Sequence, residues 1–262
     1  MRSTRINDVK GIILAAGRGS RMGSLTDAKP KCLTEIAGKT LLEWQMSAMR
    51  HAGIDDLIVV RGYQAAALPG DGYSVVDNGR WNETNMVMSL VAASEHLSAE
   101  PCIVSYADIA YHPDAVSAVI ASEDDIAIVY DVDWAELWQA RFHDPLGDAE
   151  TFRHNDGSLF EIGKTARSLD EIEGQYMGLL RISPDGWTQI IGLLAELSAS
   201  DRDRLDMTSL LSRLLDRNVR IGTIPLAGRW CEVDSEDDLK LYRSRLNEAD
   251  TANMPWHHDW RW

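Results

Sequence analysis

Short apolar runs alternate with amphipathic segments along most of this chain, and that alternation constrains the fold more than any other feature. The apolar runs predict strands at residues 11–16, 56–61, 74–77, 102–106, 126–130, 176–182 and 220–224. The amphipathic segments predict helices at residues 41–52, 85–97, 113–121, 184–197, 203–215 and 235–247. Such an alternation predicts a mainly parallel sheet with helices packed on both of its faces.

One segment departs from the alternation. Residues 149–162 read AETFRHNDGSLFEI, and their central Asn-Asp-Gly lies between two mixed apolar and polar runs, which predicts a β-hairpin. We find no internal repeat and no linker-like stretch, so the sequence predicts a single domain over residues 1–262. Within it we expect an insertion or lid at about 147–175 and an aromatic tail at 250–262. The tail is expected to dock onto the body or onto a second subunit, which leaves a homodimer open.

Composition excludes several classes of partner. The 262-residue chain carries a formal net charge of -15, whereas nucleic acids and anionic membranes are bound through positive surfaces. No stretch approaches the roughly 20 apolar residues that span a bilayer, and we recognise no signal peptide. The three cysteines are far apart and form no CxxC pair, which favours a cytoplasmic protein with reduced thiols.

A glycine-rich loop with several cations follows the first predicted strand. The stretch GIILAAGRGSRMGSLTDAKPKCL runs from residue 11 to residue 33. Glycines at 17 and 19 let the backbone approach an anion closely, because glycine has no Cβ. The cations suited to neutralise a polyphosphate are Arg18, Arg21, Lys29 and Lys31. A turn with solvated cations is the alternative, and neither the dinucleotide fingerprint nor the P-loop matches this spacing.

The same stretch resembles a known signature. Leu-Ala-Ala-Gly-x-Gly-x-Arg-Met at 14–22, followed by Pro-Lys-x-Leu at 30–33, is similar to the motif of nucleotidyltransferases that make sugar nucleotides and related CDP or CMP conjugates. The resemblance extends over roughly residues 10–245. It implies a Rossmann-like, three-layer α/β/α mixed sheet of the nucleotide-diphospho-sugar transferase type, with a nucleoside triphosphate over its first loop.

The resemblance also implies roles for individual residues. Lys31 would contact the α-phosphate, while Arg18 and Arg21 would hold the departing β- and γ-phosphates. The nucleotide would lie against the loop residues Leu14, Ala15, Ala16, Gly17, Gly19 and Ser20.

Two aspartates are candidates for binding Mg²⁺, a hard cation that prefers carboxylate oxygens. Asp108 closes a predicted strand, and strand carboxyl ends line the ligand crevice of open α/β sheets. Asp234 follows Trp-Cys-Glu-Val near the start of the last predicted helix. In the resembled family, aspartates in corresponding segments share a magnesium ion. A helix cap is the alternative for each residue, and we expect the two to lie close enough to share one ion.

Residues 81–90 point to the nucleotide base. They read WNETNMVMSL, which is similar to the T-N-N-x-x-S-L segment of bacterial phosphocholine cytidylyltransferases and of relatives that cytidylylate aminoalkylphosphonates. The resemblance implies that Asn85 and Ser89 bind the nucleotide, and it favours CTP with a small acceptor. Met86 replaces the second asparagine of that segment, which leaves the acceptor open. A helix N-terminus is the alternative interpretation.

Three later stretches are candidates for an acceptor pocket. Asp131, Asp133 and Trp134 place two carboxylates beside aromatic rings, which suits an ammonium group. Lys164 is suited to an acceptor phosphate or phosphonate, and Tyr176 lies in a GQYMG segment similar to one near the acceptor in the resembled family. Solvated acids and a surface lysine are the alternatives. The Asp-Val-Asp at 131–133 also resembles the metal motif of glycosyltransferases, which lack the glycine-arginine loop.

Together these features predict a magnesium-dependent cytidylyltransferase. It would join CMP from CTP to a small amine-bearing phosphate or phosphonate and release pyrophosphate, with phosphocholine and 2-aminoethylphosphonate as leading acceptors. A sugar-1-phosphate nucleotidyltransferase is the alternative enzyme. A nucleotide-sensing module that keeps the fold without the chemistry is the alternative from a different class.

Overall fold

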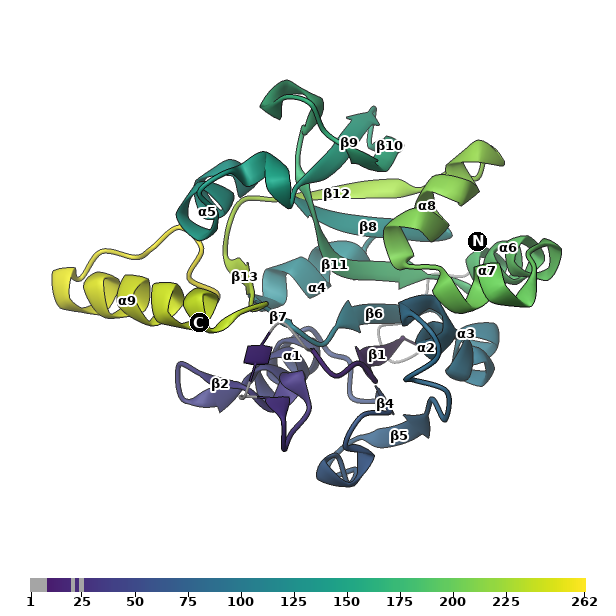
Figure 1. Cartoon of the computed structure of the whole chain (residues 1–262), viewed down its shortest axis with the longest axis horizontal. Coiled ribbons are helices and arrows are strands. Elements are labelled where there is room, and N and C mark those ends of the chain that lie inside the picture. Colours follow the sequence, from purple (N-terminus) through teal and green to yellow (C-terminus); the bar gives the residue numbers. More distant parts are fainter. Residues whose placement is uncertain (1–8, 20–21, 24–25) are drawn as a thin grey trace.

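A computed structural model describes residues 9–19, 22–23 and 26–262 of the chain (Figure 1). The centre of the described structure is a nine-stranded sheet in the order β5-β4-β1-β6-β11-β8-β12-β10-β9. The strands of this sheet are β1 (Lys10–Ala15), β4 (Leu57–Arg61), β5 (Ser74–Asp77), β6 (Cys102–Tyr106), β8 (Ile126–Asp131), β9 (Glu150–Asn155), β10 (Ser158–Thr165), β11 (Gln175–Ile182) and β12 (Gly222–Leu226).

Strand direction decides where a ligand can bind. The strands β5, β4, β1 and β6 are parallel neighbours, and β8 pairs in parallel with β12. β11 lies between β6 and β8 and is antiparallel to both, so these two strands point the same way. The carboxyl ends of all six parallel strands therefore lie at one edge of the sheet. The predicted fold class, an α/β/α arrangement with a mixed sheet, is confirmed.

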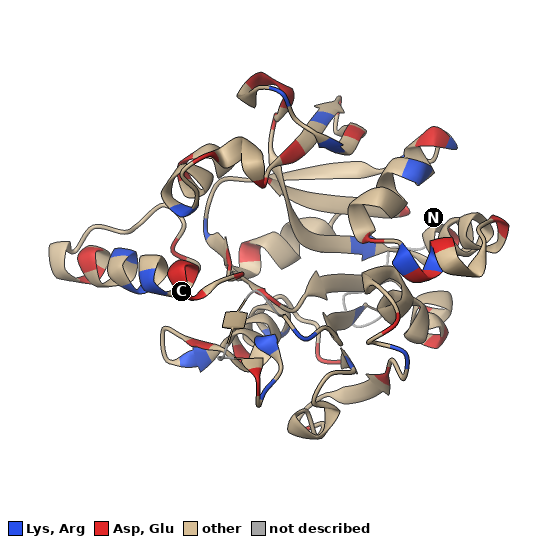
Figure 2. Cartoon of the chain, viewed as in Figure 1, with Lys and Arg blue, Asp and Glu red and all other residues tan. Residues whose placement is uncertain are grey.

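Helices cover both faces of the sheet. α1 (Leu41–His51) and α4 (Pro113–Ile120) pack together on one face. The other face carries α2 (Met86–Ala92), α3 (Ser94–Ala99), α6 (Pro184–Glu196) and α8 (Met207–Asp216), and the remaining helices are α5 (Trp134–Arg141), α7 (Ala199–Arg204) and α9 (Glu236–Ala252). Charged residues gather on the helices and on the outer hairpin β9–β10, while the central strands carry few (Figure 2). Within the described ranges no helix is long and apolar enough to cross a bilayer.

Two predicted helices are divided in the structure. The segment 85–97 forms α2 and α3, and the Ser94 hydroxyl at the junction donates to the Val91 carbonyl, which competes with regular helix bonding. The segment 203–215 begins with the end of α7 and continues as α8, because Asp206 accepts a hydrogen bond from the Ser209 backbone N–H and caps a new helix.

The structure contains two short antiparallel β-ribbons that we did not predict from the sequence. β2 (Glu35–Ile36) pairs with β3 (Lys39–Thr40), and β7 (Ile109–Tyr111) pairs in an antiparallel sense with β13 (Trp230–Glu232). Just beyond the second ribbon, the Val233 backbone N–H donates to the Asp108 carbonyl over 2.9 Å. This pairing joins the turn after β6 to the segment that leads into α9.

The predicted hairpin and the predicted tail are both part of the folded body of the protein. β9 and β10 form the hairpin and extend the edge of the main sheet through β12. After α9 the chain turns back, so Trp260 is fully buried and its ring meets Trp44 edge-on at 6.2 Å between centroids. Closure of residues 147–175 over an acceptor stays a prediction.

Candidate active site

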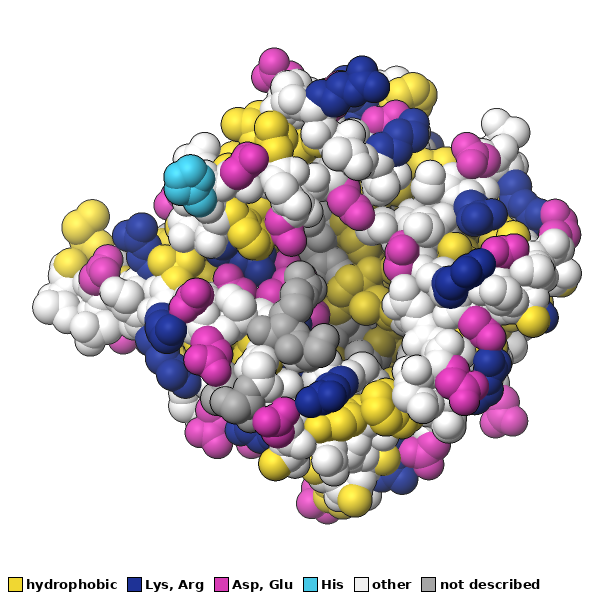
Figure 3. Space-filling model, viewed as in Figure 1, with side chains coloured by type: hydrophobic (Ala, Val, Ile, Leu, Met, Phe, Trp, Pro, Cys, Tyr) yellow, Lys and Arg dark blue, Asp and Glu magenta, His cyan; other side chains and the backbone are white. Residues whose placement is uncertain are grey.

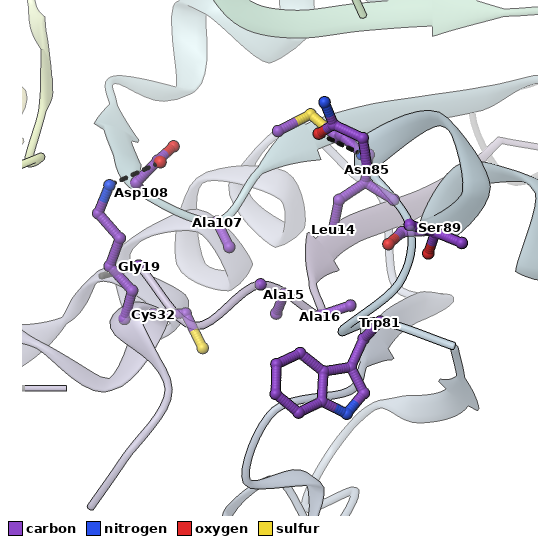
Figure 4. Close-up of a pocket in the computed structure, with 14 residues that line it drawn as sticks. Leu14, Ala15, Ala16, Gly19, Cys32, Trp81, Asn85, Ser89, Ala107 and Asp108 are labelled. Atoms are coloured by element: carbon purple, nitrogen blue, oxygen red, sulfur yellow. Dashed lines mark hydrogen bonds and ion pairs between the residues drawn. The ribbon is translucent and has the colours of Figure 1, made fainter. Parts of the chain in front are cut away.

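A pocket of about 280 Å³ opens where β1 and β6 end. Asp108 lies at one end of it and Asn85 and Ser89 at the other, with Ala15 and Ala16 between them (Figure 4). The surface on this face is hollowed at its centre, with hydrophobic side chains in the floor and acidic side chains along the rim (Figure 3). The lining residues are Leu14, Ala15, Ala16, Gly17, Gly19, Lys31, Cys32, Trp81, Thr84, Asn85, Met86, Ser89, Ala107 and Asp108.

The loop after β1 is shaped around Lys31. Gly19 has φ +67°, and a Cβ at this position would lie 2.8 Å from Lys31 Cδ, so both the backbone and the packing require glycine. Pro30 leads into a short 3-10 helix, Lys31–Leu33, which directs the lysine stem under the loop. Lys31 is 8% exposed.

Lys31 joins the two aspartates that the sequence singled out. Its Nζ lies 2.8 Å from Asp108 Oδ2 and 2.6 Å from Asp234 Oδ1. Burial alone lowers the pKa of Lys31, but the two carboxylates outweigh it and raise that pKa above its ordinary value. The structure therefore brings Lys31 together with both acids, which lie 126 residues apart in the chain.

Glu232 is a third carboxylate at this point. Ligand oxygens of Asp108, Glu232 and Asp234 all lie within 4.8 Å of one another. Burial, and then the charge of Asp234, raises the pKa of Glu232 to about 7. Asp108 Oδ1 is buried without a hydrogen-bond partner, which is the condition of an oxygen with coordination capacity to spare. A cluster of three carboxylates fits a hard divalent cation such as Mg²⁺.

Arg141, from α5, supports the acids from behind. Its side chain is fully buried, and it forms ion pairs with Glu232 at 2.9 Å, Asp234 at 3.3 Å and Asp238 at 2.9 Å. The guanidinium also lies 4.8 Å from the Trp138 ring centroid. Burial lowers the pKa of Arg141, and the surrounding groups more than offset this effect, so the guanidinium stays charged and fixes these acids in place.

The opposite end of the pocket is aromatic and neutral. The Trp81 indole borders the pocket beside Ala15 and Ala16 (Figure 4), and it meets the Tyr63 ring at 5.4 Å between centroids. A Cβ on Gly62 would lie 2.5 Å from Trp81 Cβ, so only glycine leaves room for the indole. This end offers a flat surface to a nucleobase, and the Lys31–Asp108 end offers charge to its phosphates.

The predicted phosphate and nucleotide residues are distributed as follows. Lys31, Gly17, Gly19, Asn85 and Ser89 line the pocket, as do Leu14, Ala15 and Ala16. Arg18 is half-exposed, pairs with Asp27 at 3.1 Å and lies outside the lining. Ser20 and Arg21 lie outside the described residues, so their predicted contacts stay predictions.

The predicted acceptor residues do not form one site. Asp131 and Trp134 are buried in the interior, Asp133 pairs with His257 at 2.8 Å, and Lys164 is an exposed partner of Glu161. Tyr176 is also buried, and its ring contacts Tyr106, two residues before Asp108, at 5.7 Å between centroids. We therefore withdraw Asp131 and Trp134 from the acceptor site, since neither side chain is accessible to a ligand.

Asp131 instead anchors the tail. Its Oδ2 accepts from Trp230 Nε1 at 2.8 Å and contacts His258 Nε2 at 3.0 Å, while its Oδ1 accepts from the backbone N–H groups of Gly228 and Asp133. Burial alone raises the pKa of Asp131, but these hydrogen bonds outweigh it and hold that pKa below its usual value. The sequence predicted that the tail docks, but it did not identify Asp131 as the anchor, because Trp230 and His258 lie about a hundred residues further along.

The Asp131→Asn variant is expected to lose about 2–4 kcal/mol of unfolding free energy at pH 7. In one orientation the NH₂ group of the new amide faces the backbone N–H groups of Gly228 and Asp133, and in the other it faces Trp230 Nε1. Each of these groups is a hydrogen-bond donor. Because the folded state holds the pKa of Asp131 low, the aspartate stabilises the fold above roughly pH 4 and this contribution disappears as the pH falls further. Urea unfolding at pH 7 and pH 3 should show the deficit shrinking at the lower pH. The exposed neighbour variant Asp133→Asn should change stability little, and an equal deficit at both pH values would contradict the prediction.

The fold places a charged pocket at the carboxyl edge of its sheet, which is where α/β enzymes of this architecture bind their ligands. Residues 11–159 match the MobA-like NTP transferase domain, and the chain belongs to that family of nucleotidyltransferases. It is 35% identical to the CTP:phosphoglutamine cytidylyltransferase of Campylobacter jejuni over 89% of this chain and 98% of that protein. It is also 33% identical to the choline-phosphate cytidylyltransferase of Streptococcus pneumoniae, over 34% of this chain and 41% of that one.

Solved structures share the fold at lower identity. The inositol-1-phosphate CTP transferase of T. maritima superposes with a TM-score of 0.71 at 20% identity, covering 89% of this chain and 94% of that one. The CTP:phosphocholine cytidylyltransferase of Streptococcus pneumoniae superposes with a TM-score of 0.69 at 21% identity, covering 91% and 99%.

Four residues of the site were missed from the sequence. Glu232 lies in the quoted segment that contains Asp234, and Trp81 opens the quoted segment that contains Ser89, so both had a signal nearby. No sequence signal marked Arg141, because its side chain contacts acids that lie about 90 residues further along the chain. Asn78, whose side-chain amide donates to Ser89 Oγ beneath the pocket, follows a short strand and resembles an ordinary turn residue.

Proposed function

We propose that this protein is a magnesium-dependent cytidylyltransferase. It transfers CMP from CTP to a small amine-bearing acceptor with a phosphate or phosphonate group and releases pyrophosphate. The observation that carries the proposal is the meeting of Lys31, Asp108 and Asp234 at the charged end of the pocket. Support for CTP comes from the relatives, whose names assign them CTP together with phosphorylated small molecules.

The chemistry needs positioning and charge rather than a base. An acceptor oxygen, already ionised near neutral pH, attacks the α-phosphorus; the bond to the oxygen that bridges the α- and β-phosphates breaks, and pyrophosphate leaves with the electron pair. Lys31 donates hydrogen bonds to the α-phosphate, and Gly17 and Gly19 let the backbone approach the other phosphate oxygens. Asp108, Glu232 and Asp234 would hold Mg²⁺, which supplies charge neutralisation when bound.

The acceptor side favours an amine. Tyr106 and Tyr176 form an aromatic pair next to Asp108, and acidic side chains stand along the rim of the hollow (Figure 3). Aromatic faces and carboxylates attract an ammonium group through cation–π and charge interactions. Phosphocholine and 2-aminoethylphosphonate remain leading acceptors, and phosphorylated glutamine joins them because of the similarity to the Campylobacter jejuni enzyme.

Pyrophosphate release from a panel of substrates tests the proposal. The purified chain with CTP and MgCl₂ is expected to turn over at least one of the three amine-bearing acceptors, and EDTA should abolish the reaction. Asp234→Asn is the matched inactive control, expected to reduce turnover at least a hundredfold.

Two outcomes would overturn the assignment. Turnover with glucose 1-phosphate and none with amine acceptors would favour a sugar-1-phosphate nucleotidyltransferase. Tight CTP binding without pyrophosphate release under any acceptor would favour a nucleotide-sensing module.

A further inference from the structure

Asn78 organises the neutral end of the pocket. It follows β5, is 7% exposed, and its amide reaches three groups of the segment that contains Trp81. Asn78 Oδ1 accepts from the Arg80 backbone N–H at 3.0 Å, and Asn78 Nδ2 donates to Thr84 Oγ1 at 3.2 Å and Ser89 Oγ at 3.0 Å. The orientation of the amide is fixed, because a backbone N–H only donates and must face the amide oxygen.

The fixed amide determines the direction of both hydroxyl groups. Thr84 Oγ1 accepts from Asn78 and donates to the Arg80 carbonyl at 2.8 Å, so its hydrogen is used. Ser89 Oγ accepts from the same amide, and no acceptor for its own hydrogen is present among the residues described. Ser89 is 6% exposed and lines the pocket. Its hydroxyl is thus presented to a ligand as a donor.

The donor lies at the end where a base would bind. Ser89 and Trp81 lie away from Asp108, on the other side of Ala15 and Ala16 (Figure 4). Pyrimidine bases differ in polarity at ring position 3, since cytosine N3 is an acceptor and uracil N3–H is a donor. A site committed to donating a hydrogen bond accepts the first base and leaves two donors facing each other with the second.

We propose that Asn78 is a specificity-determining positioning residue that holds the Ser89 hydroxyl as a donor to N3 of cytosine. The inference rests on the proposed function, which supplies the cytidine nucleotide. Selection for CTP over UTP then depends on an amide beneath the pocket that itself touches no substrate.

The Asn78→Asp variant tests this by reversing polarity with little change in shape. Both carboxylate oxygens accept, so the Arg80 contact is kept while the Ser89 hydrogen turns toward residue 78 and its oxygen faces the pocket. Calorimetric titration of CTP and UTP at pH 8 with MgCl₂ and without acceptor gives the ratio of dissociation constants. We expect the preference for CTP to fall at least tenfold, with tighter UTP binding than in the wild type.

Two further variants keep the test decisive if the first folds poorly. Ser89→Ala should weaken CTP about tenfold while leaving UTP no weaker. Ser98→Ala is the matched control, because it removes an exposed hydroxyl that donates to the Ser94 carbonyl on α3, outside the pocket lining, and should leave the CTP/UTP ratio unchanged.

The outcomes separate this inference from the proposed function. A wild-type ratio in both Asn78→Asp and Ser89→Ala, or an equal loss of both nucleotides, would overturn the role of Asn78 while CTP turnover by the wild type stands. A wild-type protein that binds neither nucleotide would overturn both.

Discussion

Replacing Lys31 with methionine is expected to lower the rate of pyrophosphate release at saturating CTP about a thousandfold. Methionine keeps the stem that packs beneath Gly19 but removes the ammonium group that faces Asp108 and Asp234. In the proposed reaction, negative charge grows on the phosphates as the bond breaks, and a buried positioned cation is worth roughly this factor. Steady-state kinetics with a pyrophosphate-coupled assay measures the loss.

We expect the same substitution to strengthen the binding of a metal ion, although it slows the reaction. The Lys31 ammonium lies between the acids at hydrogen-bond distance from both, so it competes with any other cation for their oxygens. Lys31→Met should therefore bind Mn²⁺ more tightly than the wild type when no nucleotide is present. Lys240→Met, on the exposed surface of α9, is the matched control and should alter neither property. A rate within tenfold of the wild type would contradict the role given to Lys31.

Sequence motifs predicted the part of the site that comes from continuous segments of the chain. The glycine–lysine stretch and the 81–90 segment are continuous in the chain, and each places its residues at the carboxyl end of a strand. Because parallel strands present those ends at one edge, the meeting of Gly19, Ser89 and Asp108 at a single pocket follows from the strand order alone.

The other half depends on pairings that carry no periodic signal. Asp108 lies near Asp234 because β7, which follows Asp108, pairs with β13, which precedes Asp234, and strands of three residues show no alternation of their own. The prediction that Asp131 binds an acceptor is withdrawn for a related reason. The pattern DVDW shows acids at a strand end, but whether they are solvated depends on Trp230 and His258, which arrive from distant segments.

Replacing Arg141 with methionine is expected to cost about 3–5 kcal/mol of unfolding free energy. The side chain is fully buried among Glu232, Asp234 and Asp238, and removing its charge leaves these carboxylates facing one another in a medium that solvates them poorly. Arg245→Met is the matched control, because Arg245 is about half-exposed and its pair with Glu248 spans 3.5 Å, so its loss should cost under about 1 kcal/mol. Urea unfolding monitored by circular dichroism measures both.

A double variant shows whether charge or packing causes the loss. If uncompensated carboxylates are responsible, adding Glu232→Gln to Arg141→Met removes one of them and should recover part of the lost stability. If the loss came from packing against Trp138, the second substitution would restore nothing, because it leaves the space beside that ring unchanged. A recovery of at least 1 kcal/mol would show that Arg141 stabilises the fold by compensating the charges of Glu232, Asp234 and Asp238.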